Sequence, residues 1–182
     1  MDYHRRSIRL RGYDYAQIGY YFVTVCVQHR DCLLGEIING RIKLNPIGKM
    51  VNLWWGETMN KFTPERQYDF VIMPNHIHGI VVINGVGADR CVCPNNTIEL
   101  TNSHEGAHIG APLPHIIRWF KTMTTNEYLK NISIMKWPNI DKRLWQRNYY
   151  EHIIRNEKDY WAIKQYMENN PKNWEKDELF IS

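Results

Sequence analysis

The chain has 182 residues, of which 43% are hydrophobic and 23% charged, with a formal net charge of +4 at pH 7. This length and composition predict one domain, residues 1 to 182, with a single core, and they exclude a largely disordered chain. No stretch approaches the ~18 apolar residues of a membrane helix, and the charged start MDYHRRSIRLRG has no apolar signal segment, so we expect a cytoplasmic protein with no membrane partner.

The first segment, residues 1 to 11, is basic. It carries Arg5, Arg6, Arg9 and Arg11 against a single acid, and two tyrosines follow it closely. Cations beside aromatic rings suit single-stranded nucleic acid, whose phosphates pair with arginine and whose bases stack. A solvated basic arm explains the same pattern, and these residues alone favour that simpler interpretation.

The next segments predict a strand, a hairpin and a helix. The run YYFVTVCV at 20 to 27 is rich in aromatic and β-branched residues, which is typical of a strand. An Asn-Gly pair between two short apolar stretches predicts a tight hairpin over 33 to 44. A helix over about 46 to 60 follows, with Asn45 as its N-cap and a proline in its first turn.

A pair of histidines marks the following strand, MPNHIHGIVVI. Pro74 and Asn75 interrupt the strand pattern and predict a bulge or kink directly before the pair. His76 and His78 share one face because successive side chains of a strand alternate. They can hold one divalent ion and leave positions open for other ligands. A structural pair arises by chance as well, so both interpretations stay open.

The second half predicts a loop, two helices and a short strand. Residues 84 to 111 hold four glycines, and their apolar residues follow neither helical nor strand spacing, which predicts a long surface loop. Helices are predicted over about 113 to 129 and from Asn156 to about 170, where a proline follows, with a short strand and turn over 140 to 154. About four strands and three helices in mixed order favour an α+β fold, with helices over a mainly antiparallel sheet.

The last predicted helix carries a tyrosine and an amide on one face. Tyr166 and Asn170 lie four residues apart, beside the apolar stripe that faces the core. A tyrosine there can reach the sheet and can act as a covalent nucleophile, and the amide can supply an oxygen to a metal. The chain has 11 tyrosines, however, and a packing role explains Tyr166 better when it is taken singly.

Five segments in order carry a family resemblance: RRSIRLRGYDY, YYFVTVCVQHR, VIMPNHIHGIV, LWQRNYYEHIIRNEKDY and QYMENNPKNW. Together they resemble the HUH single-tyrosine transposases, in particular the REP-associated tyrosine transposases. The resemblance spans residues 5 to 174, and only the loop at 84 to 111 and the far C-terminus match poorly. It implies a ferredoxin-like, RRM-like α+β fold and cleavage of single-stranded DNA next to a hairpin.

The resemblance implies roles for particular residues. His76 and His78 match the metal-binding pair, for Mg²⁺ or Mn²⁺. Tyr166 matches the nucleophile, because it stands five residues before the proline of Asn170-Pro171. Asn170 falls where relatives place a third polar metal ligand.

The resemblance also implies a DNA interface. The residues expected to contact the DNA backbone are Arg5, Arg6, Arg9, Arg11, Arg118 and Lys121. Arg147 and His152 match positions that recur in relatives, with no chemical step assigned to either. A homodimer is plausible for the wider transposase class, and nothing in the sequence shows one.

The implied reaction is a strand transfer. Tyr166 attacks the scissile phosphate and leaves a 5′-phosphotyrosine and a free 3′-OH, which needs no nucleotide cofactor. Two other functions compete with it. HIT-type nucleotide hydrolases and transferases need a third histidine where this chain has Ile80, which argues against that class. A non-catalytic or domesticated hairpin-binding protein would have nearly the same sequence.

Overall fold

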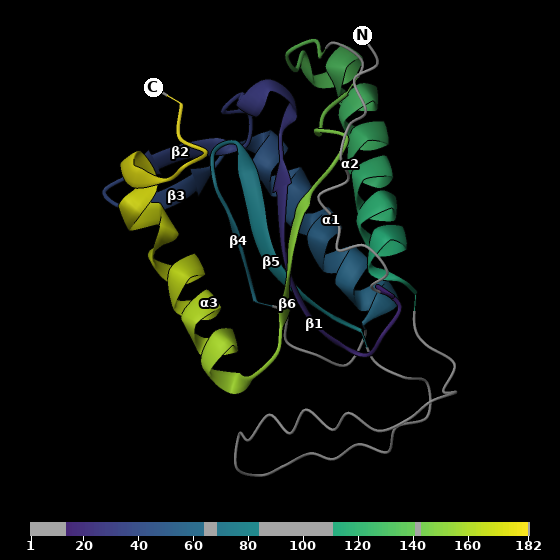
Figure 1. Ribbon diagram of the computed structural model, residues 1–182. Helices are drawn as coiled ribbons and strands as arrows, with labels where there is room; N and C mark the ends of the chain where they lie inside the picture. Colours follow the sequence, from purple (N-terminus) through teal and green to yellow (C-terminus); the bar gives the residue numbers. More distant parts are fainter. Residues whose placement is uncertain (1–13, 64–68, 84–110, 141–142, 182) are drawn as a thin grey trace, which may run out of the picture.

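A computed structural model describes residues 14–63, 69–83, 111–140 and 143–181 (Figure 1). The predicted basic arm at 1 to 11 and all but the last residue of the predicted loop at 84 to 111 lie outside the described residues. Within the described part of the chain, no helix combines the length and the apolar character needed to cross a membrane.

The main sheet has four strands in the order β4-β5-β1-β6, and every neighbouring pair is antiparallel. With two helices, the chain order of this core is β1-α1-β4-β5-α2-β6, the βαββαβ succession of ferredoxin-like folds. The predicted α+β fold with a mainly antiparallel sheet is therefore confirmed. The elements are β1 (Gly19–Cys26), α1 (Pro46–Phe62), β4 (Phe70–Ile72), β5 (His76–Ile83), α2 (Leu113–Met135) and β6 (Tyr150–Ile154).

A hairpin is inserted between β1 and α1. Its strands β2 (Gly35–Ile38) and β3 (Arg41–Leu44) pair antiparallel in a sheet of their own. Asn39 and Gly40 form the turn with φ of 51° and 70°, the left-handed values that a type I′ turn requires. The hairpin prediction is confirmed, and this second sheet raises the number of strands above the predicted four or so.

The predicted helix starts are confirmed, and so is the end of the last helix, whereas the end of α2 differs. The side chain of Asn45 caps α1 and that of Asn156 caps α3 (Glu157–Asn169), each by accepting a backbone N–H. α2 continues to Met135, beyond the predicted end near 129, because neither glycine nor proline interrupts it. α3 ends at Asn169, as predicted from the proline that follows, and a separate 3-10 segment, η2 (Asn170–Lys176), comes after it.

The predicted kink before the histidines is a turn between two separate strands. The N–H of Met73 donates to the carbonyl of His76 at 2.8 Å, and β4 and β5 pair antiparallel on either side. The prediction of a single interrupted strand was therefore wrong. Proline favours a turn here because its fixed φ suits the first central turn position and it has no N–H for a ladder.

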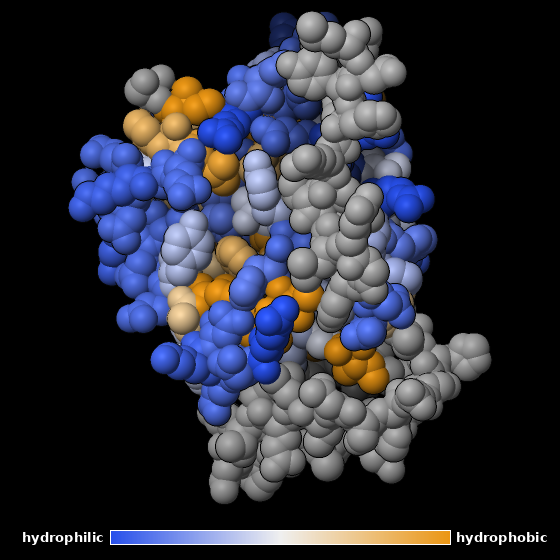
Figure 2. All heavy atoms as spheres, viewed as in Figure 1, coloured by the Kyte–Doolittle hydropathy of each residue, from blue (hydrophilic) through white to orange (hydrophobic). Residues whose placement is uncertain are grey.

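Different helices cover the two faces of the sheet. Figure 1 shows α1 and α2 together on one face and α3 on the other. Ile163 and Met167 of α3 belong to an apolar cluster with Ile80 and Val82 of β5. Figure 2 shows a mostly hydrophilic surface in the same view, with apolar residues gathered beside α3 where it meets the sheet. All of β5 is buried, so a polar side chain on this strand needs a partner.

Gly79 allows α1 to pack closely on β5. A Cβ built on Gly79 would lie 2.3 Å from Cζ2 of the fully buried Trp55. We expect Gly79→Ala to lower the free energy of unfolding by about 1–3 kcal/mol, as overpacking a core does. Chemical denaturation measures the change, with Gly19→Ala as the control, because a Cβ there meets nothing nearer than 3.8 Å. Equal losses in both variants would contradict this packing argument.

Candidate active site

Two buried histidines lie on the α3 face of the sheet. His76 and His78 project from β5 on the same side as Ile80, and their exposed fractions are 0% and 3%. Their Nε2 atoms lie 2.9 Å apart. Two nitrogen lone pairs at this distance repel one another, so a proton or a cation must lie between them. The shared face predicted from the sequence therefore brings both ring nitrogens to one point.

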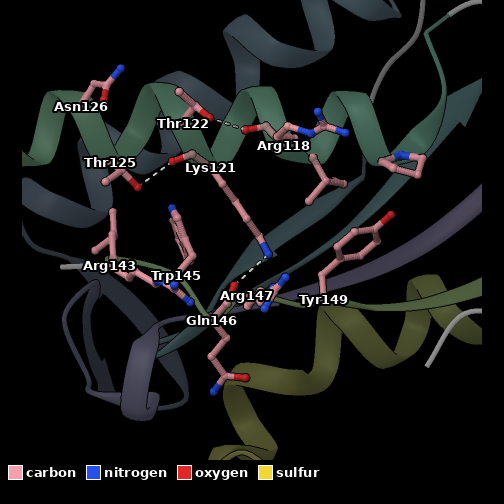
Figure 3. A pocket seen from close by; sticks show the side chains of 13 residues that line it. Arg118, Lys121, Thr122, Thr125, Asn126, Arg143, Trp145, Gln146, Arg147 and Tyr149 are labelled. Atoms are coloured by element: carbon pink, nitrogen blue, oxygen red, sulfur yellow. Dashed lines mark hydrogen bonds between the residues drawn. The ribbon is translucent and has the colours of Figure 1, made fainter. Parts of the chain in front are cut away.

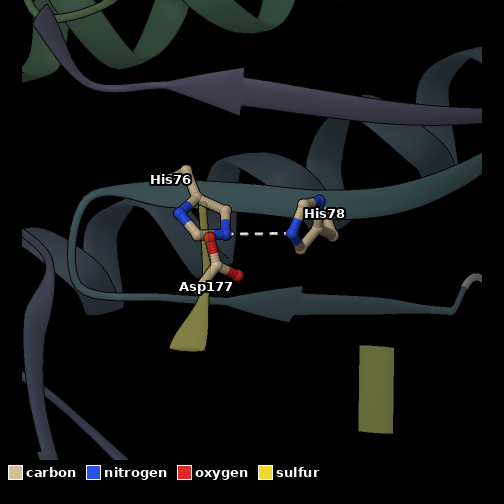
Figure 4. Close-up of side chains that lie close together, drawn as sticks. All are labelled: His76, His78 and Asp177. Carbon is tan, nitrogen blue, oxygen red and sulfur yellow. Dashed lines mark hydrogen bonds between the residues drawn. The ribbon is translucent and has the colours of Figure 1, made fainter. Parts of the chain in front are cut away.

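A carboxylate completes a three-residue cluster. Asp177, in the segment that follows η2, places a carboxylate oxygen near both histidines, and the three ligand atoms all lie within 4.8 Å of one another (Figure 4). Two imidazoles and a carboxylate are a common ligand set for divalent metals. This cluster could hold a metal ion.

Asn75 determines which nitrogen of His76 faces the cluster. Its amide nitrogen donates to the carbonyl oxygens of Arg30 and Leu179, at 3.0 and 2.8 Å. Its amide oxygen must therefore be the atom that lies 2.8 Å from Nδ1 of His76. An oxygen acceptor there requires a proton on Nδ1, which leaves the lone pair of Nε2 directed into the cluster.

Thr24 holds His78 in the corresponding way. Thr24 lies opposite His78 in the β1–β5 ladder, and its hydroxyl is 2.8 Å from Nδ1 of the ring. A hydroxyl can donate or accept, so it satisfies this nitrogen in either tautomer of His78. Partners of this kind fix the orientation of metal-binding imidazoles and raise their basicity.

Both imidazoles are neutral at pH 7. Burial lowers the pKa of His76 to about 3, and the charge of Arg30 acts in the same direction. Burial also lowers the pKa of His78 to about 3, with a further contribution from His76 and an opposing one from Asp177. Neutral imidazole is the form that binds a metal, so no proton has to be removed from a charged ring first.

Tyr166 lies beside the cluster. Its hydroxyl is 3.3 Å from Nε2 of His78, and its ring meets those of His78 and Phe22 edge-on. Burial raises the pKa of Tyr166 to about 12, and the negative charges of Asp177 and Glu178 add to the rise. The phenol is therefore protonated at pH 7. Its side chain is nevertheless 47% exposed, so a large substrate can reach it.

Asn170 connects the helix to the carboxylate. Its amide nitrogen donates to Oδ2 of Asp177 at 2.7 Å. Its amide oxygen is buried and has no hydrogen-bond partner among the described residues. An unpartnered buried carbonyl is costly, and a divalent cation would satisfy it. The two histidine nitrogens and the carboxylate of Asp177 could therefore hold a metal ion, and the unpartnered oxygen of Asn170 is a candidate for a further ligand.

The structure brings together four site residues expected from the sequence: His76 and His78 on β5, Tyr166 on α3 and Asn170 at the start of η2. It adds three that the sequence reasoning missed, namely Asn75, Thr24 and Asp177. The sequence marks Asn75 only as part of the interruption before the histidine strand. It does not show how the strand that holds Thr24 is aligned with that strand. Asp177 follows η2, and no spacing rule links it to the histidines.

Other predicted residues lie elsewhere. Arg118 and Lys121 are on α2, on the opposite face of the sheet. His152 pairs with Asp159 at 2.9 Å, which ties β6 to the start of α3. The four arginines of the N-terminal arm lie outside the described residues.

We expect Thr24→Val to lower the affinity for Mn²⁺ by about 10- to 100-fold, because the substitution removes the hydroxyl that holds His78. Titration followed by electron paramagnetic resonance measures this affinity. Thr58→Val is the matched control, since Thr58 is also buried but its hydroxyl donates to the carbonyl of Trp54 within α1. If both variants bind Mn²⁺ like the original chain, Thr24 does not orient a metal ligand.

Comparison with known proteins places the chain in a family. No model of a known protein family matches it. An uncharacterized protein of Haemophilus influenzae is 42% identical, over 98% of this chain and 94% of that protein. The chain belongs to the family of that protein. The relative's own description assigns it no activity.

A solved structure shows the same fold. A REP-associated tyrosine transposase bound to a REP hairpin aligns with a TM-score of 0.52 and 19% identity, over 91% of this chain and 73% of that one. At this identity the likeness concerns the fold. The resemblance to HUH single-tyrosine transposases is therefore confirmed at the level of the fold.

Proposed function

We propose that the chain is a metal-dependent single-stranded DNA endonuclease and strand transferase that acts next to DNA hairpins in transposition. The proposal rests above all on the hydroxyl of Tyr166, 3.3 Å from Nε2 of His78 and beside the cluster with His76 and Asp177. The fold adds support, because the similar REP-associated transposase binds a REP hairpin.

Tyr166 suits the role of a nucleophile that must meet a large substrate. The hydroxyl lies at the cluster while nearly half of the side chain is exposed. Ring contacts with Phe22 and His78 restrict the orientation of the phenol. Holding a nucleophile in one orientation removes part of the entropic cost of reaction.

The metal would be held by His76, His78 and Asp177, with the amide oxygen of Asn170 as a further ligand. When bound, a divalent cation such as Mg²⁺ or Mn²⁺ supplies positive charge that offsets the charge developing on the scissile phosphate. Asn75 orients the ring of His76 whether or not a metal is bound, since its partners are all protein atoms.

The reaction exchanges one phosphoester for another. The bond between Oη of Tyr166 and phosphorus forms, the bond between phosphorus and the 3′ oxygen breaks, and the phenolic proton ends on that oxygen. The products are a 5′-phosphotyrosine and a free 3′-OH. Because a phosphodiester is kept, attack by the 3′-OH of another strand reverses the step and joins that strand without a nucleotide cofactor.

Incubation of the purified protein with labelled single-stranded hairpin oligonucleotides and Mn²⁺ tests the proposal. We expect a covalent adduct that survives a denaturing gel and that mass spectrometry maps to Tyr166 as a 5′-phosphotyrosine. An adduct on another tyrosine would keep the reaction and overturn the site. Hairpin binding without any adduct, across hairpins and metals, would favour the non-catalytic or domesticated hairpin-binding protein.

A further inference from the structure

A hollow of about 680 Å³ lies between α2 and residues 143 to 149 (Figure 3). His76, His78 and Asp177 do not line it, and among the described residues no carboxylate does. Its lining includes four cationic side chains, Arg118, Lys121, Arg143 and Arg147. We call this hollow the basic groove.

Lys121 is engaged by the fold. Its ammonium donates to the carbonyl oxygens of Gln146 and Asn148, both at 3.0 Å, and lies 5.4 Å from the ring centroid of Tyr149. These contacts fasten residues 143 to 149 to α2 and so form the floor of the groove. We therefore infer that Lys121 holds the groove in shape and does not itself contact a bound ligand.

The three arginines are available to a ligand. Figure 3 shows Arg118 on α2 and Arg143 and Arg147 on the segment that faces it. All three are exposed, and within the described parts of the chain no guanidinium group of the three has an ion-pair or hydrogen-bond partner. Cations gathered around a hollow without acids raise the local potential and attract an anion. The planar guanidinium group binds phosphate through two parallel hydrogen bonds.

The groove lies at the same end of the sheet as the cluster of His76, His78 and Asp177. The N–H of Gln146 donates to the carbonyl of Cys26 at 2.9 Å, and Cys26 pairs with His76 in the β1–β5 ladder. The groove is on the α2 side and Tyr166 on the α3 side, and β6 forms the sheet edge between them. A nucleic acid held in the groove can therefore pass a strand around this edge to Tyr166.

We propose that the basic groove binds the phosphate backbone of a base-paired DNA stem through Arg118, Arg143 and Arg147. The lining favours a paired stem over a single strand. Its aromatic rings, Trp145 and Tyr149, are buried, so they offer no face on which an unpaired base can stack. A paired stem, in contrast, can be bound through its phosphates without any stacking of bases. The identity of the nucleic acid as DNA rests on the proposed function.

The test compares the chain with the triple variant R118Q/R143Q/R147Q. Fluorescence anisotropy measures binding to a labelled DNA hairpin of arbitrary stem sequence, in a chelator and between about 50 and about 200 mM salt. We expect the affinity at the lower salt to fall at least about tenfold, and the salt slope to shrink by about 0.9 for each phosphate contact removed. Lys49→Gln, an exposed cation on α1 outside the groove, should change neither value.

Three results would overturn the proposal. The first is unchanged affinity and slope in the triple variant with its circular dichroism intact, and the second is no binding of any hairpin by the original chain. The third is an equal loss for a stemless oligonucleotide of the same composition, which would reject a paired stem as the ligand. Binding in a chelator involves no cleavage, so a missing adduct on Tyr166 would reject the proposed function without bearing on the groove.

Discussion

Replacing Tyr166 by phenylalanine is expected to abolish the covalent DNA adduct and to slow strand cleavage by at least about 10³-fold. The substitution removes the hydroxyl that lies 3.3 Å from Nε2 of His78 and keeps the ring that meets Phe22 and His78. The fold, the affinity for Mn²⁺ and the affinity for hairpin DNA should therefore remain. Single-turnover cleavage assays and denaturing gels measure the loss, and calorimetric titration measures the two affinities.

Tyr150→Phe is the matched control. Tyr150 lies on β6 and is 49% exposed, close to the 47% of Tyr166. Among the described residues, however, no contact joins Tyr150 to His76, His78 or Asp177. We expect full adduct formation in this variant. Adduct formation that persists in Tyr166→Phe, or that disappears in Tyr150→Phe, would remove Tyr166 from the role of nucleophile.

His76→Ala is expected to abolish cleavage and to weaken Mn²⁺ binding by more than the about 10- to 100-fold loss typical of residues that only orient a ligand. The side chain supplies one of the three ligand atoms, and its Nε2 carries a lone pair directed at the other two. Hairpin affinity should be retained, because the basic groove lies on the other face of the sheet. Calorimetric titration with Mn²⁺ and anisotropy with hairpin DNA measure the two affinities separately.

A thermal melt of His76→Ala supplies the control for folding. The imidazole is fully buried, so an unfolded variant would show that the pair serves the core, and the metal assignment would lose its support. His76→Gln keeps a polar group of similar size and provides a second variant if alanine does not fold. A folded variant that still binds Mn²⁺ and cleaves DNA would contradict the metal site directly.

Asp177→Asn is expected to weaken Mn²⁺ binding more strongly than Asn170→Ala does. Asp177 contributes a full negative charge to the cluster, whereas the unpartnered amide oxygen of Asn170 contributes only a dipole. Because the two side chains share a 2.7 Å hydrogen bond, the double variant should be less affected than the two separate losses predict. Titration of all three variants measures this. A larger loss in Asn170→Ala would make the amide the principal third ligand.

Local patterns in the sequence predicted most elements of the fold. The Asn-Gly turn, the caps at Asn45 and Asn156 and the aromatic strand at 20 to 27 each depend on interactions within a few residues. The connection at Pro74-Asn75 was misjudged, because the same residues suit a bulge or a turn, and only the antiparallel pairing of β4 with β5 decides between them.

By itself, the sequence determined which residues could perform the chemistry. Alternation along a strand places His76 and His78 on one face of that strand. Helical spacing places Tyr166 and Asn170 on one side of the last helix, since backbone geometry fixes both periods. Only the tertiary structure decided what surrounds them. Strand register placed Thr24 opposite His78, the carbonyl groups of Arg30 and Leu179 oriented the amide of Asn75, and the chain after η2 brought Asp177 to the histidines. Such contacts join residues far apart in the chain, and no local interaction specifies them.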